Sequence, residues 1–169
     1  MTYSVLVPDH NFSKEAETIS AWTFKAKTML PKSTKEIKQF VNEGRSVFVW
    51  DQNLGLVAHA AITFFWSLNW AELGAVVVDP EQRGKGWGTI AVIALLGLVK
   101  EKFPDKKPFA LCNIYSLGIF MRAGGQIIKD PNLLPNEVWK ECNNCPNFQK
   151  AKSEGRLCCD TPVLLNSNK

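Results

Sequence analysis

The chain has 169 residues, of which 46% are hydrophobic and 21% charged, and its net charge is +4. These values are typical of a globular protein with enough chain for one substantial core. The basic residues are not concentrated in one arm of the chain, so nucleic acid is not indicated as a partner. The N-terminal segment lacks the basic and long apolar regions of a secretory signal, which predicts a cytoplasmic protein. The uncharged stretch 86–99 is too short to cross a membrane, so it predicts a buried helix.

Two helices are predicted after a short strand near the N-terminus. Apolar residues recur at three- and four-residue spacing after Ser13, which predicts a helix that Ser13 caps and that stops before Pro31. Ser33 and Glu36 have the spacing of a capping box, and Gly44 stands where a helix often ends. A second, short helix is therefore predicted between Ser33 and Gly44.

The middle of the chain is predicted to form an antiparallel meander, because β-branched and aromatic runs alternate with short turn sequences. Its three strands are residues 45–51, 56–66 and 70–78. The elements predicted after it are a helix from Trp87 toward Phe103, a strand over 108–112, a helix over 116–123, and strands over 126–129 and 161–165. Residues 131–160 are left as an unusually long connection before the last strand.

A glycine-rich basic turn follows the strand that ends at Val78, and it reads Arg83-Gly84-Lys85-Gly86-Trp87-Gly88-Thr89. Three glycines at alternate positions let backbone N–H groups converge on an anion, and the positive end of the next helix points to the same place. The Walker and dinucleotide-binding spacings are both absent. The turn therefore predicts a phosphate site of another kind.

This turn resembles the Arg-Gly-x-Gly-x-Gly/Ala signature of the GNAT superfamily of acyl-CoA N-acyltransferases. In that family the signature follows a strand, and here the turn follows the strand end Val78-Asp79-Pro80. The later run 113–125 resembles the second conserved block of that family, and the resemblance covers about residues 3–130. It implies an α/β GNAT fold, with a mixed, mostly antiparallel central sheet flanked by helices and acyl-CoA bound between two splayed central strands. We expect a single domain over residues 1–169, with a cysteine-rich insert at about 131–160.

The resemblance also implies acetyl-CoA as the co-substrate. Backbone N–H groups from Arg83 to Thr89 would hold the pyrophosphate, and the strand edge around Val77 would pair with the pantetheine arm and polarise the thioester carbonyl. Asn113 would anchor the pantetheine or cap the next helix. The full set of implied CoA-binding residues is Val76, Val77, Val78, Arg83, Gly84, Lys85, Gly86, Trp87, Gly88, Thr89, Asn113, Ser116 and Phe120.

Acyl transfer to an amine needs a base, and two residues are candidates. Glu72 stands near the start of the strand where several family members carry a base, and its aromatic neighbours would raise its pKa by desolvation. A solvated glutamate at a strand end is the other interpretation. His59 lies in an apolar strand and titrates in the useful range, although a lone core histidine is usually structural. Whether these two residues share a face depends on the hairpin register.

The departing CoA thiolate receives a proton from a tyrosine in many family members, but Phe120 occupies that place here. Phenylalanine has no proton to give. Tyr115, Ser116 or water would have to substitute, and a thiolate is a tolerable leaving group near its own pKa of about 8.5.

Four cysteines lie close together in the sequence beyond the region of resemblance. Cys142 and Cys145 form a C-x2-C pair, and Cys158 and Cys159 are adjacent. Clustered thiolates in a cytosolic chain indicate a structural zinc site, while adjacent cysteines make a cramped pair of ligands. Disulfides and free thiols remain the alternatives, and Cys112 is predicted to be a buried strand residue.

Together these features predict an acetyl-CoA-dependent N-acetyltransferase of the GNAT type, acting by direct attack of an amine acceptor that the sequence does not identify. Its partners would be acetyl-CoA and a small molecule or protein that bears the amine, with no nucleic acid and no membrane, in a monomer or homodimer. The alternative is a weak or inactive acyl-CoA-binding regulatory module with a zinc-stabilised insert for protein interaction, which the phenylalanine at position 120 favours.

Overall fold

The computed structural model describes residues 2–8, 12–147 and 158–166. Its strands are β1 (Tyr3–Leu6), β2 (Ser46–Asp51), β3 (Gly55–Trp66), β4 (Trp70–Val78), β5 (Lys107–Cys112), β6 (Gln126–Ile127) and β7 (Thr161–Leu164). Its α-helices are α1 (Ser13–Lys25), α2 (Thr34–Asn42), α3 (Trp87–Lys102), α4 (Leu117–Arg122) and α5 (Asn136–Asn144). Short 3-10 turns occupy Pro80–Gln82 and Pro131–Leu133. No helix in these ranges combines the length and apolar character needed to cross a bilayer.

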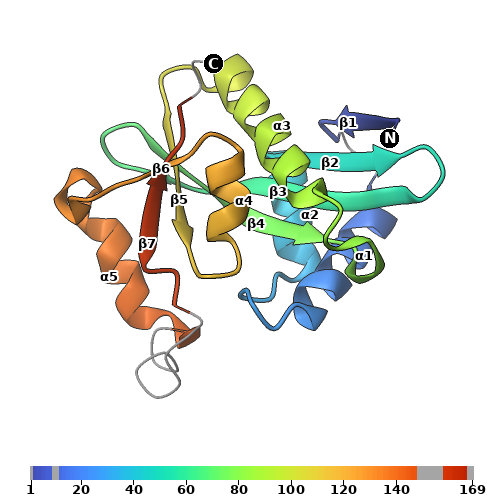
Figure 1. Cartoon of the computed structure of the whole chain (residues 1–169), viewed down its shortest axis with the longest axis horizontal. Helices are drawn as coiled ribbons and strands as arrows, with labels where there is room; N and C mark the ends of the chain where they lie inside the picture. The colour runs from blue at the N-terminus through green and yellow to red at the C-terminus, as the bar shows by residue number, and fades with distance from the viewer. Residues whose placement is uncertain (1, 9–11, 148–157, 167–169) are drawn as a thin grey trace.

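The strands form one sheet in the order β1-β2-β3-β4-β5-β7-β6 (Figure 1). The paired strands are antiparallel except for β4 and β5, which run parallel. A helix, α3, makes the crossover between these two parallel strands, as parallel pairing requires. The mixed, mostly antiparallel sheet predicted from the sequence is therefore confirmed.

Helices cover both faces of this sheet (Figure 1). On one face, α3 and α4 bury a core that includes Trp87, Leu95 and Phe120. On the other face, α1 and α2 bury a second core that includes Ile19 and Ile37. Helix α5 belongs to this second face because it packs on side chains of β4 and β5 that alternate with those of the first core. The second face is thus walled by α1 and α2 on one side and by α5 on the other.

Helix α1 is shorter than predicted, and Ser13 does not cap it. Ser13 is its first residue, and the capping position is occupied by Phe12, which makes no side-chain bond there. The helix ends at Lys25 instead of continuing toward Pro31. Beyond this end, Asn113 Nδ2 donates to the carbonyl of Thr28 at 2.7 Å. The connection between α1 and α2 is therefore held by tertiary contacts.

The boundaries of α2 and α3 follow their predicted signals more closely. Ser33 and Glu36 form the expected capping box at the start of α2, and Gly44 has a positive φ of 64° after its end. Helix α5 was not predicted, since residues 131–160 were interpreted only as a long connection. Its buried residue Val138 packs with Leu134 against the sheet.

Strand β4 carries the irregularity that shapes the centre of the molecule. Its pairing with β3 shifts between Gly74 and Val77, and Ala75 within the shift has a positive φ of 48°. This bulge exchanges the faces of β4, so that Glu72 and Ala75 point to the same side of the sheet. On its other edge, β4 pairs with β5 only from Trp70 to Glu72. The two strands then separate, as the expected acyl-CoA site requires.

Candidate active site

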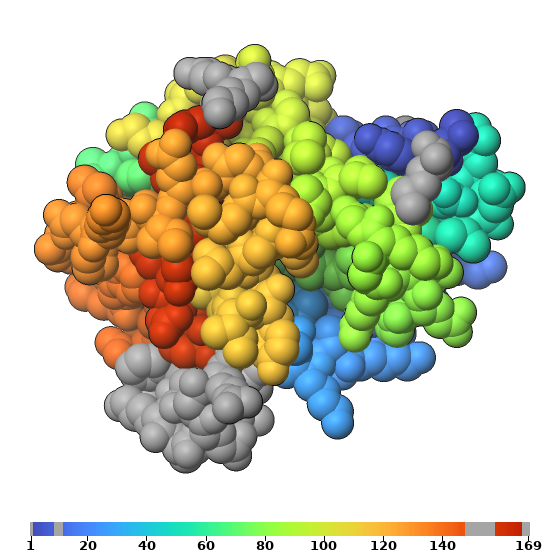
Figure 2. Space-filling view, viewed as in Figure 1, coloured from blue at the N-terminus to red at the C-terminus, as the bar shows by residue number. Residues whose placement is uncertain are grey.

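A cleft of about 550 Å³ lies where β4 and β5 separate. Its walls come from β4, from the turn before α3, from the β5–α4 connection and from the connection between α1 and α2. Figure 2 shows the surface hollowed where the green turn before α3, the yellow-orange segment of α4 and the blue residues after α1 meet. The predicted CoA-binding residues line this cleft with the exception of Lys85.

The glycine-rich turn presents unpaired backbone donors to the cleft. Among the described hydrogen bonds, none has its donor at a backbone N–H between Arg83 and Gly88, and the first internal bond of α3 is donated by Thr89. The start of the helix adds the positive end of its dipole. Several N–H groups and a helix start therefore point to one place, an arrangement suited to a pyrophosphate.

Glycine is required in this turn for two different reasons. Gly84 and Gly86 have positive φ values of 79° and 87°, a conformation that other residues adopt only with strain. Gly88 permits close packing instead, because a Cβ there would lie 3.1 Å from Ile119 Cδ1. The turn thus depends on glycine for its backbone shape and for the approach of α4 to α3.

Three basic side chains surround the turn, and one of them was not predicted. Arg83 and Arg122 line the cleft, whereas Lys85 is exposed and donates to Gln82 Oε1 at 2.7 Å. Arg122 is at the end of α4, and its Nε donates to Thr89 Oγ1 at 3.4 Å. Because Arg122 is 33 residues beyond Thr89 in the chain, no local spacing in the sequence indicates the contact.

Both the oxygen and the nitrogen of the Asn113 side-chain amide form hydrogen bonds that hold two walls of the cleft together. Its Oδ1 accepts from the backbone N–H groups of Tyr115 and Ser116, both at 3.0 Å, and so forms the turn that leads into α4. Its Nδ2 donates to the carbonyl of Thr28, across the cleft from β5. Asn113 therefore fastens the connection between α1 and α2 to the start of α4.

Glu72 lies at the point where β4 and β5 part. Glu72 and Phe109 form the last residue pair between the two strands, and the side chain of Glu72 lines the cleft and is half-buried. Trp66 Nε1 donates to Glu72 Oε2 at 2.9 Å. Burial raises the pKa of Glu72, while the Trp66 hydrogen bond and the positive charge of Lys32 act in the opposite direction. The carboxylate therefore lies at the cleft with a raised pKa, and its predicted role as a base stays a prediction.

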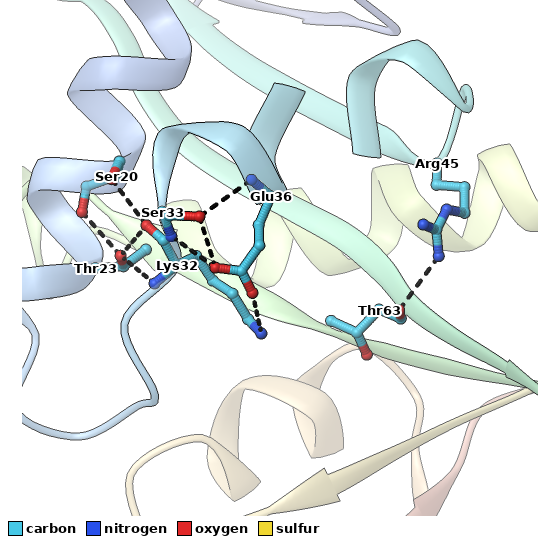
Figure 3. Close-up of polar contacts among 7 residues, drawn as sticks. All are labelled: Ser20, Thr23, Lys32, Ser33, Glu36, Arg45 and Thr63. Atoms are coloured by element: carbon cyan, nitrogen blue, oxygen red, sulfur yellow. Dashed lines mark hydrogen bonds and ion pairs between the residues drawn. The ribbon is translucent and has the colours of Figure 1, made fainter. Parts of the chain in front are cut away.

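Lys32 is a second charged group at this end of the cleft, and it was not predicted. Figure 3 shows its backbone tied to α1, since its N–H donates to Thr23 Oγ1 at 2.8 Å and its carbonyl accepts from Ser20 Oγ at 2.8 Å. Its Nζ donates to Glu36 Oε1 at 3.2 Å. A lysine that lines the cleft is therefore held in place by both its backbone and its ammonium group.

His59 is buried behind the cleft. Its Nδ1 is 2.9 Å from the carbonyl of Ala75, which can only accept, so Nδ1 carries the proton. Its Nε2 is 2.7 Å from Ser46 Oγ and accepts from that hydroxyl. Burial lowers the pKa of His59 to about 4. His59 shares the face of Glu72, but it is a neutral, fully hydrogen-bonded residue that holds the bulge carbonyl of β4.

The aromatic residues after β5 differ in access to the cleft. Both Phe120 and Tyr115 line the cleft, but Phe120 is buried in the core, whereas Tyr115 is 55% exposed. Ser116 also lines it, but its Oγ accepts from the N–H of Asn113 at 3.1 Å. Tyr115 and Ser116 are the two side chains predicted to replace the family tyrosine as proton donor, and of these Tyr115 has the hydroxyl with fewer hydrogen bonds.

Two of the insert cysteines also line the same cleft. Cys145 and Cys159 line it, and all four of Cys142, Cys145, Cys158 and Cys159 are half-buried free thiols. Burial, with repulsion from the neighbouring thiols, raises the pKa of Cys142 to about 11 and that of Cys159 to about 12. Within the described ranges, no three histidine, cysteine or acidic side chains stand as a preformed metal shell. Cys112 is buried in β5, as predicted.

Solved structures share this fold at low sequence identity. N-acetylglutamate synthase from Neisseria gonorrhoeae, complexed with coenzyme A and N-acetyl-glutamate, has a TM-score of 0.68 at 14% identity, over 100% of this chain and 36% of that one. Rv2747 from Mycobacterium tuberculosis, in complex with CoA and NLQ, has a TM-score of 0.67 at 20% identity, over 96% and 98%. The ribosomal-protein-S18-alanine N-acetyltransferase from Escherichia coli has a TM-score of 0.57 at 15% identity, over 76% and 80%.

This chain spans about a third of the length of the Neisseria synthase. No curated protein sequence matches the chain significantly. The model of the acetyltransferase (GNAT) family matches residues 12–124, a range that holds the glycine-rich turn, the bulged strand β4, Glu72 and Asn113. The chain belongs to the GNAT family of acetyltransferases.

Proposed function

We propose that the protein transfers the acetyl group of acetyl-CoA to the primary amine of a small acceptor that also carries a carboxylate, such as an amino acid. The observation that carries this proposal is the layout of the cleft. Free backbone donors lie at one end, between Arg83 and Gly88, and a half-buried carboxylate, Glu72, lies where β4 and β5 part. This layout supports binding of the pyrophosphate at the turn and of the pantetheine arm along residues 73–78.

In the proposed reaction, the acceptor ammonium first gives a proton to the carboxylate of Glu72, directly or through water. The free amine then attacks the thioester carbonyl carbon, which forms the C–N bond, and the C–S bond breaks with the sulfur keeping its electron pair. The nitrogen, now bonded to the acetyl group, releases its second proton to water and becomes the neutral amide. The thiolate takes up a proton from water or from Tyr115, whose hydroxyl is at the cleft. Proximity of amine and thioester supplies a large share of the rate.

The acceptor class is inferred from the charges near Glu72. Lys32 lines the same end of the cleft, and its charge acts on Glu72. An acceptor with an ammonium and a carboxylate matches this pair of opposite charges, with the ammonium at Glu72 and the carboxylate at Lys32. The N-acetyl-glutamate in the Neisseria complex is a product of the same chemical class.

The test is CoA release with pooled amino acids, with N-acetylated products identified by mass spectrometry. We expect turnover, and Lys32→Met should raise the acceptor KM about tenfold while leaving the acetyl-CoA KM unchanged, as loss of one charged contact predicts. Lys35→Met, on the exposed side of α2, is the matched control. Binding of acetyl-CoA without turnover on any amine pool would instead support the regulatory module. If Lys32→Met does not alter the acceptor preference, the proposed contact between Lys32 and the acceptor carboxylate is rejected, but acetyl transfer itself is not.

A further inference from the structure

An exposed aromatic ring, that of Phe64 near the end of β3, lies beside Glu72 in the cleft. Phe64 lines the cleft and is 48% exposed. It is the cross-strand partner of Glu72 in the antiparallel pair of β3 and β4, which are neighbours in the sheet (Figure 1). Directly paired residues project to the same side of a sheet, with their Cβ atoms about 5 Å apart. The ring therefore stands beside the carboxylate to which the acceptor ammonium is assigned.

The ring of Phe64 is packed on one side against a second aromatic ring. Its centroid is 5.1 Å from that of Trp66, two residues further along the same strand, and the two rings are tilted by 35°. Trp66 is in turn held by its hydrogen bond to Glu72. A phenylalanine exposed on a protein surface is common, but this one has a set orientation relative to the acid. It therefore forms an aromatic platform next to Glu72.

The next residue along β3 shows that exposure alone does not make such a platform. Phe65 is 41% exposed, but it is not among the described residues that line the cleft. It is paired with Ala71, whose side chain belongs to the first core, and its ring packs on Phe103 with centroids 5.0 Å apart. Phe65 is therefore on the face of the sheet away from Glu72, as the alternation of a strand requires.

Other walls of the cleft add apolar or neutral side chains. Met29 and Leu30 line it from the connection between α1 and α2. Cys159 lines it as well, and burial, with repulsion from neighbouring thiols, raises the pKa of Cys159 to about 12, so this thiol is neutral near pH 7. Lys32 is the cation whose charge acts on Glu72. The cleft thus offers a carboxylate, an ammonium group and an apolar surface.

We propose that the acceptor is an amino acid with an aromatic side chain, whose ring packs on the ring of Phe64. This inference rests on the proposed function, from which it takes the acceptor ammonium at Glu72 and the acceptor carboxylate at Lys32. With these two groups held, the side chain is the remaining large substituent of the α-carbon, and Phe64 is the apolar surface beside Glu72. A pair of aromatic rings gains more than its apolar burial alone, which favours an aromatic over an aliphatic side chain.

The experiment compares L-phenylalanine, L-leucine and L-alanine as acceptors for the full chain at saturating acetyl-CoA. We expect kcat/KM for L-phenylalanine to exceed that for L-alanine at least about tenfold and that for L-leucine about two- to tenfold. Phe64→Ala should lower the phenylalanine-to-alanine ratio about tenfold, whereas Phe65→Ala, on the other face, should keep the wild-type ratio. Because both acceptors are measured on one sample, the ratio does not depend on the fraction of enzyme that is folded.

A binding measurement separates this proposal from the proposed acetyl transfer. Calorimetric titration of the CoA complex, which carries no acetyl group, gives the Kd of L-phenylalanine and of L-alanine without turnover. Tighter binding of L-phenylalanine that Phe64→Ala removes, in a protein that acetylates no amine, would support the aromatic subsite and reject acetyl transfer.

Three results would overturn the aromatic subsite. Turnover with a phenylalanine-to-alanine ratio near one, or with a ratio that Phe64→Ala leaves unchanged, would reject the subsite and leave acetyl transfer standing. Equal kcat/KM for L-leucine and L-phenylalanine would reject the aromatic preference. Neither turnover of any amine nor binding of either amino acid to the CoA complex would reject both proposals.

Discussion

The indole N–H of Trp66 donates a hydrogen bond of 2.9 Å to the carboxylate of Glu72. This contact stabilises the charged form of Glu72 and so limits the rise in pKa that burial causes. Trp66 is at the end of β3, and the β3–β4 hairpin places it beside the acid six residues later. In the proposed reaction, this pair would set the pH range over which Glu72 accepts a proton.

Trp66→Phe is expected to move the acidic limb of the kcat profile to higher pH. The substitution removes the hydrogen bond and keeps the aromatic bulk, so the carboxylate loses a stabilising contact and its pKa rises further. The measurement is kcat for acetyl transfer against pH. Wild-type activity should increase as pH rises through the pKa of Glu72, and an unchanged midpoint in Trp66→Phe would show that Glu72 does not control the profile.

Gly86→Ala is expected to weaken acetyl-CoA binding measurably in a folded protein. Its φ of 87° costs an L-residue about 1–2 kcal/mol, so the turn either strains or changes shape. The control is Gly97→Ala in α3, where a Cβ meets nothing within 4 Å and the helix should gain about 0.5–1 kcal/mol. Calorimetric titration with acetyl-CoA and thermal unfolding of both variants make the comparison. Equal affinities in the two variants would argue against the turn as the pyrophosphate site.

Asn113 offers a pair of substitutions that separates its two functions. Asn113→Asp keeps the acceptor oxygen for the N–H groups of Tyr115 and Ser116, but it replaces the donor to Thr28 with an oxygen that faces a carbonyl. We expect both Asn113→Asp and Asn113→Ala to destabilise the fold, by about 1–3 kcal/mol, as for the loss of buried hydrogen bonds. Urea unfolding measures this. Wild-type stability in Asn113→Asp would mean that the link to Thr28 contributes nothing.

His59 should make the fold less stable in mild acid. Its pKa is lowered to about 4 in the folded protein, so between that value and the unfolded value of 6.5 only the unfolded chain binds the proton. This contribution to stability is present above pH 6.5 and is lost as pH falls toward 4, by about 3 kcal/mol in total. The pH dependence of urea unfolding should be shallower in His59→Gln. Equal slopes in the two proteins would contradict a buried neutral histidine.

The sequence was sufficient to predict features that depend on local contacts. The capping box of Ser33 and Glu36, the strand limits of β4 and the start of α3 at Trp87 all follow from short-range signals, and the structure has them where they were expected. The glycine-rich turn identified the family for the same reason. Glu72 could be named as a candidate because it stands near the start of the strand that precedes that turn, where several family members carry a base.

Features that depend on distant parts of the chain were not predictable in the same way. The connection after α1 is held by contacts between residues far apart in the sequence, because Lys32 bonds back to Thr23 of the helix and Asn113 bonds to the carbonyl of Thr28. Lys32 and Arg122 reach the cleft only through the fold, and neither has a local spacing that indicates a site. The face shared by His59 and Glu72 depends on the bulge at Ala75, which a one-residue change of register would reverse.

The most direct test of the account is the Glu72→Gln variant, measured for both turnover and acetyl-CoA affinity. We predict a fall in kcat of about 10²- to 10⁴-fold, as for loss of a general base, with an unchanged Kd for acetyl-CoA by calorimetry. Glu141→Gln, an exposed acid on α5, should retain wild-type turnover. Full turnover in Glu72→Gln would contradict the assignment of Glu72 as the base.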